Sequence, residues 1–456
     1  MRRAILLMAV VGAAVPAAAQ ENDDLNLIPG TIQAAPPPSE TAQDRGKYSL
    51  TNASGWYGYR GTFAVPSGVG VPSRWNDRLS ADALVTWKLA ESLRLTGSDV
   101  VSASFADGVG FPRQSVRNDP RELYVTWEAA PETYLEAGRI NLRNGVAFGY
   151  NPTDFFRART SVAQSSSDPG ALRNNRLGTV MIRGQKVFDG GSFELVYAPK
   201  LHSPVPLGGL AHPLDPKIDQ TNGSDRMLAS FSFEWEDFSP QLLAYYDSGR
   251  FKLGLNASHP IGNAIIAYAT WAGGEAPSVV VDAIAFGKRT RTLPVAAPVM
   301  PPVAAERSFK SDISAGAYWN GEDKETISVE YNFHQAGLSK DDWRNWFAFG
   351  ADPANASLMW YIRGYAGDRQ DPISRHQAFL RTDWIEPFHI LHADLNGYVM
   401  TDLSDGSCTG QVGASYDFSD YWSFAAYLSG TSGGRKTEWG SVSGASSVIF
   451  QIVRYL

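Results

Sequence analysis

The sequence predicts an all-β protein, an antiparallel transmembrane β-barrel of about 18 strands in an outer membrane, with 16 as the alternative count. Three observations predict this fold. Apolar and polar side chains alternate in successive segments from Ser54 onward, short turns alternate with longer connections, and tryptophans gather just before the short turns. A soluble β-sandwich would show the same alternation, but it gives tryptophans no reason to keep to one end of the strands.

The two ends of the chain set the expected domain organisation. Residues 1–19 have the pattern of a secretory signal peptide: Arg2 and Arg3, then an apolar run, then a small-residue cleavage site that ends at Ala19. Residues 20–50 are polar and rich in proline, which is typical of a disordered leader. We therefore expect cleavage after Ala19, a periplasmic leader over 20–50 and a barrel over 51–456, in the outer membrane of a Gram-negative bacterium.

Individual segments show the two-residue period of a strand. In RLSADALVTWK, residues 78–88, Leu79, Val85 and Trp87 fall on one face and Asp82 and Thr86 on the other. RELYVTWE at 121–128 and RMLASFSFEWE at 226–236 repeat this scheme. One face of each strand would then contact lipid and the other would face the lumen.

Short turns and tryptophans give the strand count. The short turns are LAES (89–92), AAPE (129–132), DGG (189–191), DFSP (237–240), HPIG (259–262), GEDK (321–324), EPF (386–388) and FSD (418–420). They join sixteen strands, and a first strand near Gly55–Val65 and a last at 444–456 complete eighteen, with both termini periplasmic. The tryptophans expected to form an interfacial girdle are Trp87, Trp127, Trp235, Trp319 and Trp384.

Composition excludes several classes of function. The net charge of −7 argues against a nucleic-acid partner, and Cys408 is the only cysteine, so no intramolecular disulfide can form. Cys-x-x-Cys, His-Glu-x-x-His and phosphate-loop patterns do not occur, so we expect no metal and no cofactor. The final segment SSVIFQIVRYL alternates as a terminal strand does, which suggests recognition by the barrel-assembly machinery.

The candidate functional segment is the third external connection, residues 142–176, which follows a strand at 133–141. Its Phe148, Tyr150, Phe155 and Phe156 can be buried and Pro152 fixes a turn, so we expect this loop to fold into the lumen, where its glycines let the backbone pack closely. The expected constriction or solute path comprises Arg139, Arg143, Arg157, Arg159, Arg173, Arg176, Asp154 and Tyr150.

Two interpretations of these arginines stay open. Clustered guanidinium groups select anions in pores. They could equally pair with lumen acids such as Asp82, Glu122 and Asp383 and brace the wall.

The run LYVTWEAAPETYLEAGRINLRNGVAFGYNPTDFF resembles a segment of proteobacterial outer-membrane barrels of the alginate-export/porin-like type. The matching positions are Gly138, Arg139, Gly145, Asn151, Pro152 and Asp154. The resemblance implies a monomeric barrel that passes an anionic polysaccharide or small organic solutes across the outer membrane.

The leading functional hypothesis is therefore not an enzyme but a porin-like channel for anionic or saccharide-type solutes, with exopolysaccharide export as one form of it. Its partners would be outer-membrane lipid and lipopolysaccharide and the solute itself. One alternative is a barrel hydrolase, for which His202 and His212 share a loop with Asp215 and Asp219. Another is a receptor or adhesin that acts through the long loops at 273–307 and 334–372, the second of which is rich in aromatic residues.

Overall fold

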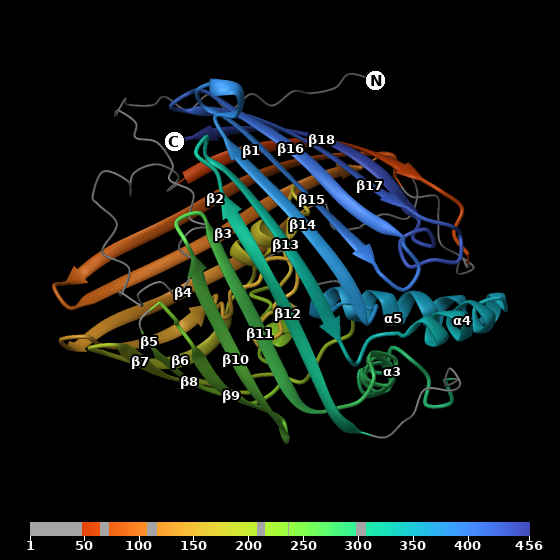
Figure 1. Cartoon of the computed structure of the whole chain (residues 1–456), viewed down its shortest axis with the longest axis horizontal. Helices are drawn as coiled ribbons and strands as arrows, with labels where there is room; N and C mark the ends of the chain where they lie inside the picture. The colour runs from red at the N-terminus through yellow and green to blue at the C-terminus, as the bar shows by residue number, and fades with distance from the viewer. Residues whose placement is uncertain (1–47, 64–72, 107–115, 208–214, 236, 298–306) are drawn as a thin grey trace.

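The computed structural model describes residues 48–63, 73–106, 116–207, 215–235, 237–297 and 307–456. These residues form 18 strands in one closed antiparallel sheet (Figure 1). The predicted signal peptide at 1–19 and the leader residues 20–47 lie outside the described residues. The strands are β1 (Tyr48–Tyr59), β2 (Trp75–Ala90), β3 (Leu93–Ala106), β4 (Val116–Ala130), β5 (Thr133–Ile140), β6 (Thr179–Phe188), β7 (Gly191–Ala198), β8 (Arg226–Phe233), β9 (Gln241–Asp247), β10 (Arg250–Ile261), β11 (Ile265–Ala276), β12 (Ser308–Asn320), β13 (Glu325–His334), β14 (His376–Ile385), β15 (Ala393–Asp402), β16 (Cys408–Ser419), β17 (Trp422–Ser432) and β18 (Gly444–Tyr455).

Each strand pairs with the next along the chain, and β1 pairs with β18 to close the barrel. The fold class and the strand count predicted from the sequence are therefore confirmed. The first strand begins at Tyr48, earlier than the predicted start near Gly55, because β1 is paired as far as Ser49 with Tyr455. Its polar and small residues hide the alternation, although Leu50 and Trp56 both point outward at about half exposure.

The barrel is apolar outside and polar inside, as lipid on one side and water on the other require. In β13 the outward Val329 is 56% exposed, whereas the neighbouring Ser328 and Glu330 face the interior at 2% or less. The opposite arrangement would be expected of a soluble sheet protein.

The barrel has a turn end and a loop end. The turn end carries the predicted short turns and both described chain termini, where Leu456 N–H donates to Tyr48 O at 3.0 Å. The tryptophans of the expected girdle lie at this end, and those of β2, β4, β12 and the β8–β9 turn are 39–67% exposed. A 3₁₀ turn, η3 (Pro387–His389), occupies the β14–β15 connection at the same end.

The loop end carries the longer connections and most of the helices. The exception is the tight β9–β10 hairpin at Ser248 and Gly249. The helices are α1 (Pro169–Asn174), α2 (Ile218–Thr221), α3 (Val279–Arg289), α4 (Lys340–Phe349), the 3₁₀ helix η2 (Pro353–Asn355) and α5 (Ala356–Arg369). Among the described residues, none of the helices is long and apolar enough to cross a membrane.

Helices α3, α4 and α5 pack together at the loop end into a unit that we call the cap (Figure 1). Ser278 caps the N-terminus of α3, and Ser339 and Asp342 form a capping box at the start of α4. The centre of the cap is apolar and includes Val280, Trp346 and Ile362, each 1% exposed. The aromatic residues predicted in the 334–372 loop thus contribute Trp343, Trp346 and Phe347 to the interior of the cap.

Candidate solute passage

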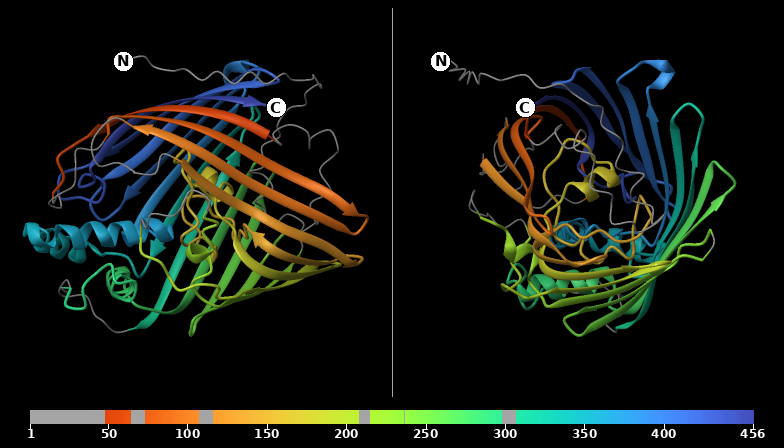
Figure 2. Two further views of the ribbon diagram at one scale, coloured as in Figure 1. Left: turned by 180° about the vertical axis from the view of Figure 1, so that it is seen from behind. Right: turned by 90° about the vertical axis from the view of Figure 1, so that its left-hand side faces the viewer.

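The connection between β5 and β6, residues 141–178, folds into the barrel; we call it the inward loop (Figure 2). Phe155 stacks on Tyr245 of β9 with the ring centroids 4.4 Å apart, and Phe156 meets the same ring edge-on. Farther along the wall, Phe148 packs edge-on against Tyr268 of β11 and Tyr318 of β12. The loop therefore rests on the β8–β12 wall and narrows the lumen.

Two glycines of the predicted motif stand where a side chain would not fit. Gly145 has φ +83°, and a Cβ there would lie 2.0 Å from Asn151 Oδ1. Gly138 has φ +136° and is pressed against the backbone of β4 at Leu123. Both positions combine a backbone conformation that favours glycine with a close approach.

Asp154 is the centre of a buried ion network within the inward loop. Arg176 binds it in bidentate fashion, with Nη1–Oδ2 and Nη2–Oδ1 distances of 2.8 and 2.9 Å, and Arg173 Nε lies 3.5 Å from Oδ2. Burial acts to raise the pKa of Asp154, but the charges of Arg176 and Arg173 outweigh it and hold the pKa below its usual value. Burial also lowers the pKa of Arg173 to about 10.

A second group of contacts ties the inward loop to the cap. Arg157 pairs with Asp371, which also accepts a hydrogen bond from Arg369 Nε at 2.8 Å. Arg159 pairs with Asp368 of α5 at 3.1 Å. Burial acts to raise the pKa of Asp371, but Arg157 and Arg369 together keep it well below the usual range.

The other predicted residues take different positions. Arg139 is buried in the wall and donates to the backbone oxygens of Gly178 and Pro216, whereas Arg143 is exposed and contacts Asn174. Tyr150 is 4% exposed, and its hydroxyl lies 3.3 Å from His334 Nδ1. Asn151 Oδ1 accepts from Thr153 within the turn that contains Pro152.

The lumen acids considered in the sequence analysis have other partners. Asp82 pairs with Arg121 and Asp383 with Arg381, while Glu122 accepts from the backbone N–H of Asn141. The candidate arginines therefore brace the inward loop mainly through its own backbone, through Asp154 and through the cap. Whether any of them also selects solutes stays a prediction.

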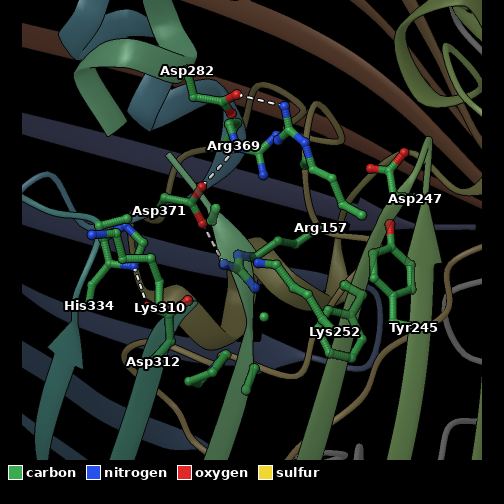
Figure 3. Close-up of a pocket in the computed structure, with 18 of the residues that line it drawn as sticks. Arg157, Tyr245, Asp247, Lys252, Asp282, Lys310, Asp312, His334, Arg369 and Asp371 are labelled. Carbon is green, nitrogen blue, oxygen red and sulfur yellow. Dashed lines mark hydrogen bonds and ion pairs between the residues drawn. The ribbon is translucent and has the colours of Figure 1, made fainter. Parts of the chain in front are cut away.

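A cavity lies between the inward loop, the β8–β13 wall and the cap, near the loop end (Figure 3). Its empty space is about 1040 Å³, including the part that is open to solvent. Of the predicted path residues, Asp154 and Arg157 line it. The polar and charged lining residues that the sequence analysis did not single out are Arg226, Tyr245, Asp247, Arg250, Lys252, Asp282, Lys310, Asp312, His334, Tyr365, Arg369 and Asp371.

Most charges around the cavity are compensated by a neighbour. Arg250 pairs with Asp282 at 3.0 Å and His334 Nδ1 with Asp312 at 2.8 Å. Lys252 and Lys310, by contrast, have no side-chain hydrogen bond or ion pair among the described residues.

The two lysines share a row of the sheet. Lys252 of β10 is in register with Gly274 of β11, and Gly274 is in register with Lys310 of β12. Residues in register on adjacent strands point to the same face. The backbones of the two lysines therefore flank Gly274 and are separated by about 10 Å, or two strand spacings. The Lys252 side chain extends over Gly274, where a Cβ would lie 2.8 Å from Lys252 Cγ. Single-strand patterns could not reveal this row, because it depends on the register of three strands.

The residues on which the hydrolase and receptor hypotheses rest take the following positions. The His202 side chain is exposed, and its ring Nδ1 lies 3.0 Å from the backbone oxygen of Ser203. His212 lies outside the described residues. In the part of the chain that the structure describes, no group of three or more His, Cys, Asp or Glu residues could hold a metal ion. The aromatic rings of the 334–372 loop that lie in the cap are buried there and do not form an exposed platform.

Comparison with solved structures identifies proteins of the same fold at very low sequence identity. OccK5 (OpdH) of Pseudomonas aeruginosa matches with a TM-score of 0.51 and 7% identity over 90% of this chain and 97% of its own. OccK11 (OpdR) of the same organism matches with a TM-score of 0.50 and 9% identity, over 90% of this chain and 95% of its own. A BenF-like porin from Pseudomonas fluorescens Pf-5 matches with a TM-score of 0.50 and 10% identity, over 91% of this chain and 99% of its own.

These likenesses show that the chain shares the barrel fold of these proteins. No protein-family model matches the sequence, and no curated protein is significantly similar to it. The resemblance of the inward-loop motif to alginate-export barrels therefore stays a prediction.

Proposed function

We propose that the protein is a channel in the outer membrane of a Gram-negative bacterium and that it passes small anionic solutes. The observation that carries the proposal is the cavity beside the inward loop, where Lys252 and Lys310 face a polar interior and form no ion pair with any residue that the structure describes. The porin fold and the outward apolar surface support the membrane location. In this proposal the turn end faces the periplasm.

The balance of charge around the cavity favours an anion. Asp154, Asp282, Asp312 and Asp371 each have a cationic or histidine partner. Among the described residues that line the cavity, Asp247 is the one acid without a side-chain partner, whereas two lysines, Lys252 and Lys310, are without one. A carboxylate between the two ammonium groups would meet opposite charge in a confined, weakly screened space.

The row of lysines also suggests the size of the solute. The Lys252 side chain extends over Gly274, where a Cβ would lie 2.8 Å from Lys252 Cγ. The flexible side chains of Lys252 and Lys310 can bring both ammonium groups to one small carboxylate or phosphate. A polysaccharide route would be favoured by exposed aromatic rings, and Trp343, Trp346 and Phe347 are instead buried in the cap. We therefore propose small anionic solutes in preference to an exported polysaccharide.

The test is ion selectivity in planar lipid bilayers. We expect an anion preference in the unmodified protein, and the double variant Lys252→Gln, Lys310→Gln should lower the ratio of chloride to potassium permeability roughly twofold or more. Lys340→Gln is the matched control, because Lys340 is exposed on α4 and has no side-chain partner among the described residues. An unaltered permeability ratio in the double variant, with folding verified by heat-modifiable gel mobility, would refute the role of the lysine row.

A further inference from the structure

Three buried polar side chains meet at the loop end, away from the cavity. Ser374 precedes β14, Asp402 ends β15 and Glu438 lies in the β17–β18 connection; all three are 2% exposed or less. Ser374 Oγ lies 2.7 Å from Asp402 Oδ2 and 2.6 Å from Glu438 Oε2. The indole N–H of Trp343, on α4, donates to the same hydroxyl oxygen at 2.9 Å.

A count of hydrogens shows what these contacts require. A serine hydroxyl has one hydrogen, and an indole can only donate. The hydroxyl can therefore donate to one of the two carboxyl groups but not to both. The other carboxyl group must itself carry a proton and donate to Ser374 Oγ, since otherwise two oxygens with lone pairs would face each other within 2.7 Å in a buried site.

We propose that Ser374, Asp402 and Glu438 form a proton-dependent clasp, which holds the cap against the β15–β16 and β17–β18 loops and opens when the shared proton is lost at alkaline pH. The clasp joins segments that are distant in the sequence. Trp343 extends it into the cap, and Arg363 of α5 donates to Glu438 O at 3.2 Å and to Ser441 Oγ at 2.6 Å.

The clasp has a physical route to the cavity. Helix α5 carries Arg363 toward the clasp and Tyr365 and Arg369 toward the cavity. Arg369 in turn contacts Asp371, the partner of Arg157 in the inward loop. A shift of α5 would thus change one wall of the cavity and the support of the inward loop together.

The charges around the clasp agree with a proton held at neutral pH. Burial is the main cause that raises the pKa of Glu438, to about 8. The charges of Asp402 and Asp405 also raise the pKa of Glu438, whereas the Ser374 hydroxyl and Arg363 lower it. Asp405 in addition accepts a hydrogen bond from the Glu438 backbone N–H. Arg363 stays charged through this range, since burial lowers its pKa only to about 10.

The direction of the pH effect follows from that shift. A carboxyl group whose pKa is raised in the closed state stabilises that state fully below its ordinary value of about 4.3. The stabilisation is lost as the pH rises through about 8. At about pH 9 the ionised form of Glu438 would exceed the protonated form by about tenfold.

Hydrogen–deuterium exchange of the folded protein in lipid tests the clasp without reference to any solute. After correction for intrinsic rates, amides of 335–375 and 433–443 should exchange about a hundredfold faster at about pH 9 than at about pH 6 in the unmodified protein. Strand β13 serves as the internal reference. Equal protection of these segments at the two pH values would overturn the proposal.

Two variants supply a donor that needs no shared proton. Glu438→Gln and Asp402→Asn each place an amide N–H beside Ser374, so both should keep the segments protected at about pH 9. Asp341→Asn, an exposed carboxyl group on α4, is the matched control and should respond as the unmodified protein does. A pH response of normal size in the folded Glu438→Gln or Asp402→Asn variant would contradict the clasp.

Discussion

At the scale of single residues, the arginines of the inward loop act mainly as donors to backbone oxygens. Arg157 donates to Asn151 O, Arg173 to Asn144 O and Arg176 to Leu142 O. An irregular segment inside a barrel has carbonyl groups that no neighbouring strand satisfies, and each buried one needs a donor. A guanidinium group offers five N–H groups and no acceptor, so it suits this position better than lysine does.

Asp154 should be the residue whose loss loosens the inward loop most. Asp154→Asn leaves the buried charges of Arg173 and Arg176 without their carboxylate, which typically costs about 3–5 kcal/mol. We expect lower stability in urea unfolding and a higher, noisier single-channel conductance, because the loop would withdraw from the lumen. Asp189→Asn, in the exposed β6–β7 turn, is the control and should change neither quantity.

The same network sets the acid tolerance of the inward loop. Because the pKa values of Asp154 and Asp371 are lowered in the folded protein, their stabilising effect is present above the ordinary aspartate pKa of about 3.9 and is lost only as the pH falls through the lowered values. The conductance of the unmodified protein at about pH 4 should therefore remain that of the narrowed lumen.

At the scale of elements, the inward loop is anchored to the wall by a carboxylate. Glu330 of β13 accepts hydrogen bonds from the backbone N–H groups of Phe148 and Gly149, the latter at 2.8 Å, and from the Tyr268 hydroxyl at 2.7 Å. Glu330 lies on a different part of the barrel from β5, where the loop begins. The Glu330 side chain thus holds the middle of the inward loop through the loop backbone, and these two bonds do not depend on which side chains the loop carries.

Removal of this anchor should detach the middle of the inward loop. Glu330→Ala leaves the half-buried backbone N–H groups of Phe148 and Gly149 without this acceptor, at about 1 kcal/mol each. We expect faster amide exchange of residues 145–150 and an increased conductance in bilayers. Glu322→Ala, in the exposed β12–β13 turn, is the matched control, and similar exchange in the two variants would show that Glu330 is not the anchor.

The sequence predicted the regular elements well and the site only in part. The alternation, the short turns and the position of a tryptophan just before a turn are local patterns along one strand. A single sequence is therefore enough to detect them, as it was for Trp87, Trp127 and Trp319. The register that aligns Lys252 with Lys310, and the packing that brings Asp371 to Arg157, depend on contacts between distant segments. A guanidinium group can attract a passing anion or stabilise the inward loop through hydrogen bonds and ion pairs. The arginine pattern alone therefore could not distinguish the two roles.

At the scale of the whole molecule, the outward apolar surface is the property that commits the barrel to a bilayer. Large apolar side chains such as Val412 and Leu428, at 61% and 58% exposure, face outward near the middle of their strands. Aromatic side chains such as Tyr416 mark the turn end on the same face. This arrangement predicts that the cost of a charge on the surface depends on its depth.

A pair of substitutions in β16 measures that depth. Val412→Arg should lower the free energy of unfolding in lipid vesicles by about 2–4 kcal/mol, whereas Tyr416→Arg should cost only about 0–1 kcal/mol, because arginine at the interface can reach the head groups. Both residues are on one face of one strand, so each serves as the control for the other. Equal costs would contradict the proposed position of the membrane.

The adjacency of Tyr48 and Leu456 gives the strand order a nearly cyclic character. Every strand pairs with its neighbour in the chain, and the β1–β18 seam is the one junction among the described strands that no turn connects. A peptide link across that seam, with the backbone opened at another short turn, would leave all the pairings unchanged. The place of the seam thus has little effect on the final architecture, because it changes which neighbouring strands a turn connects and not which strands pair.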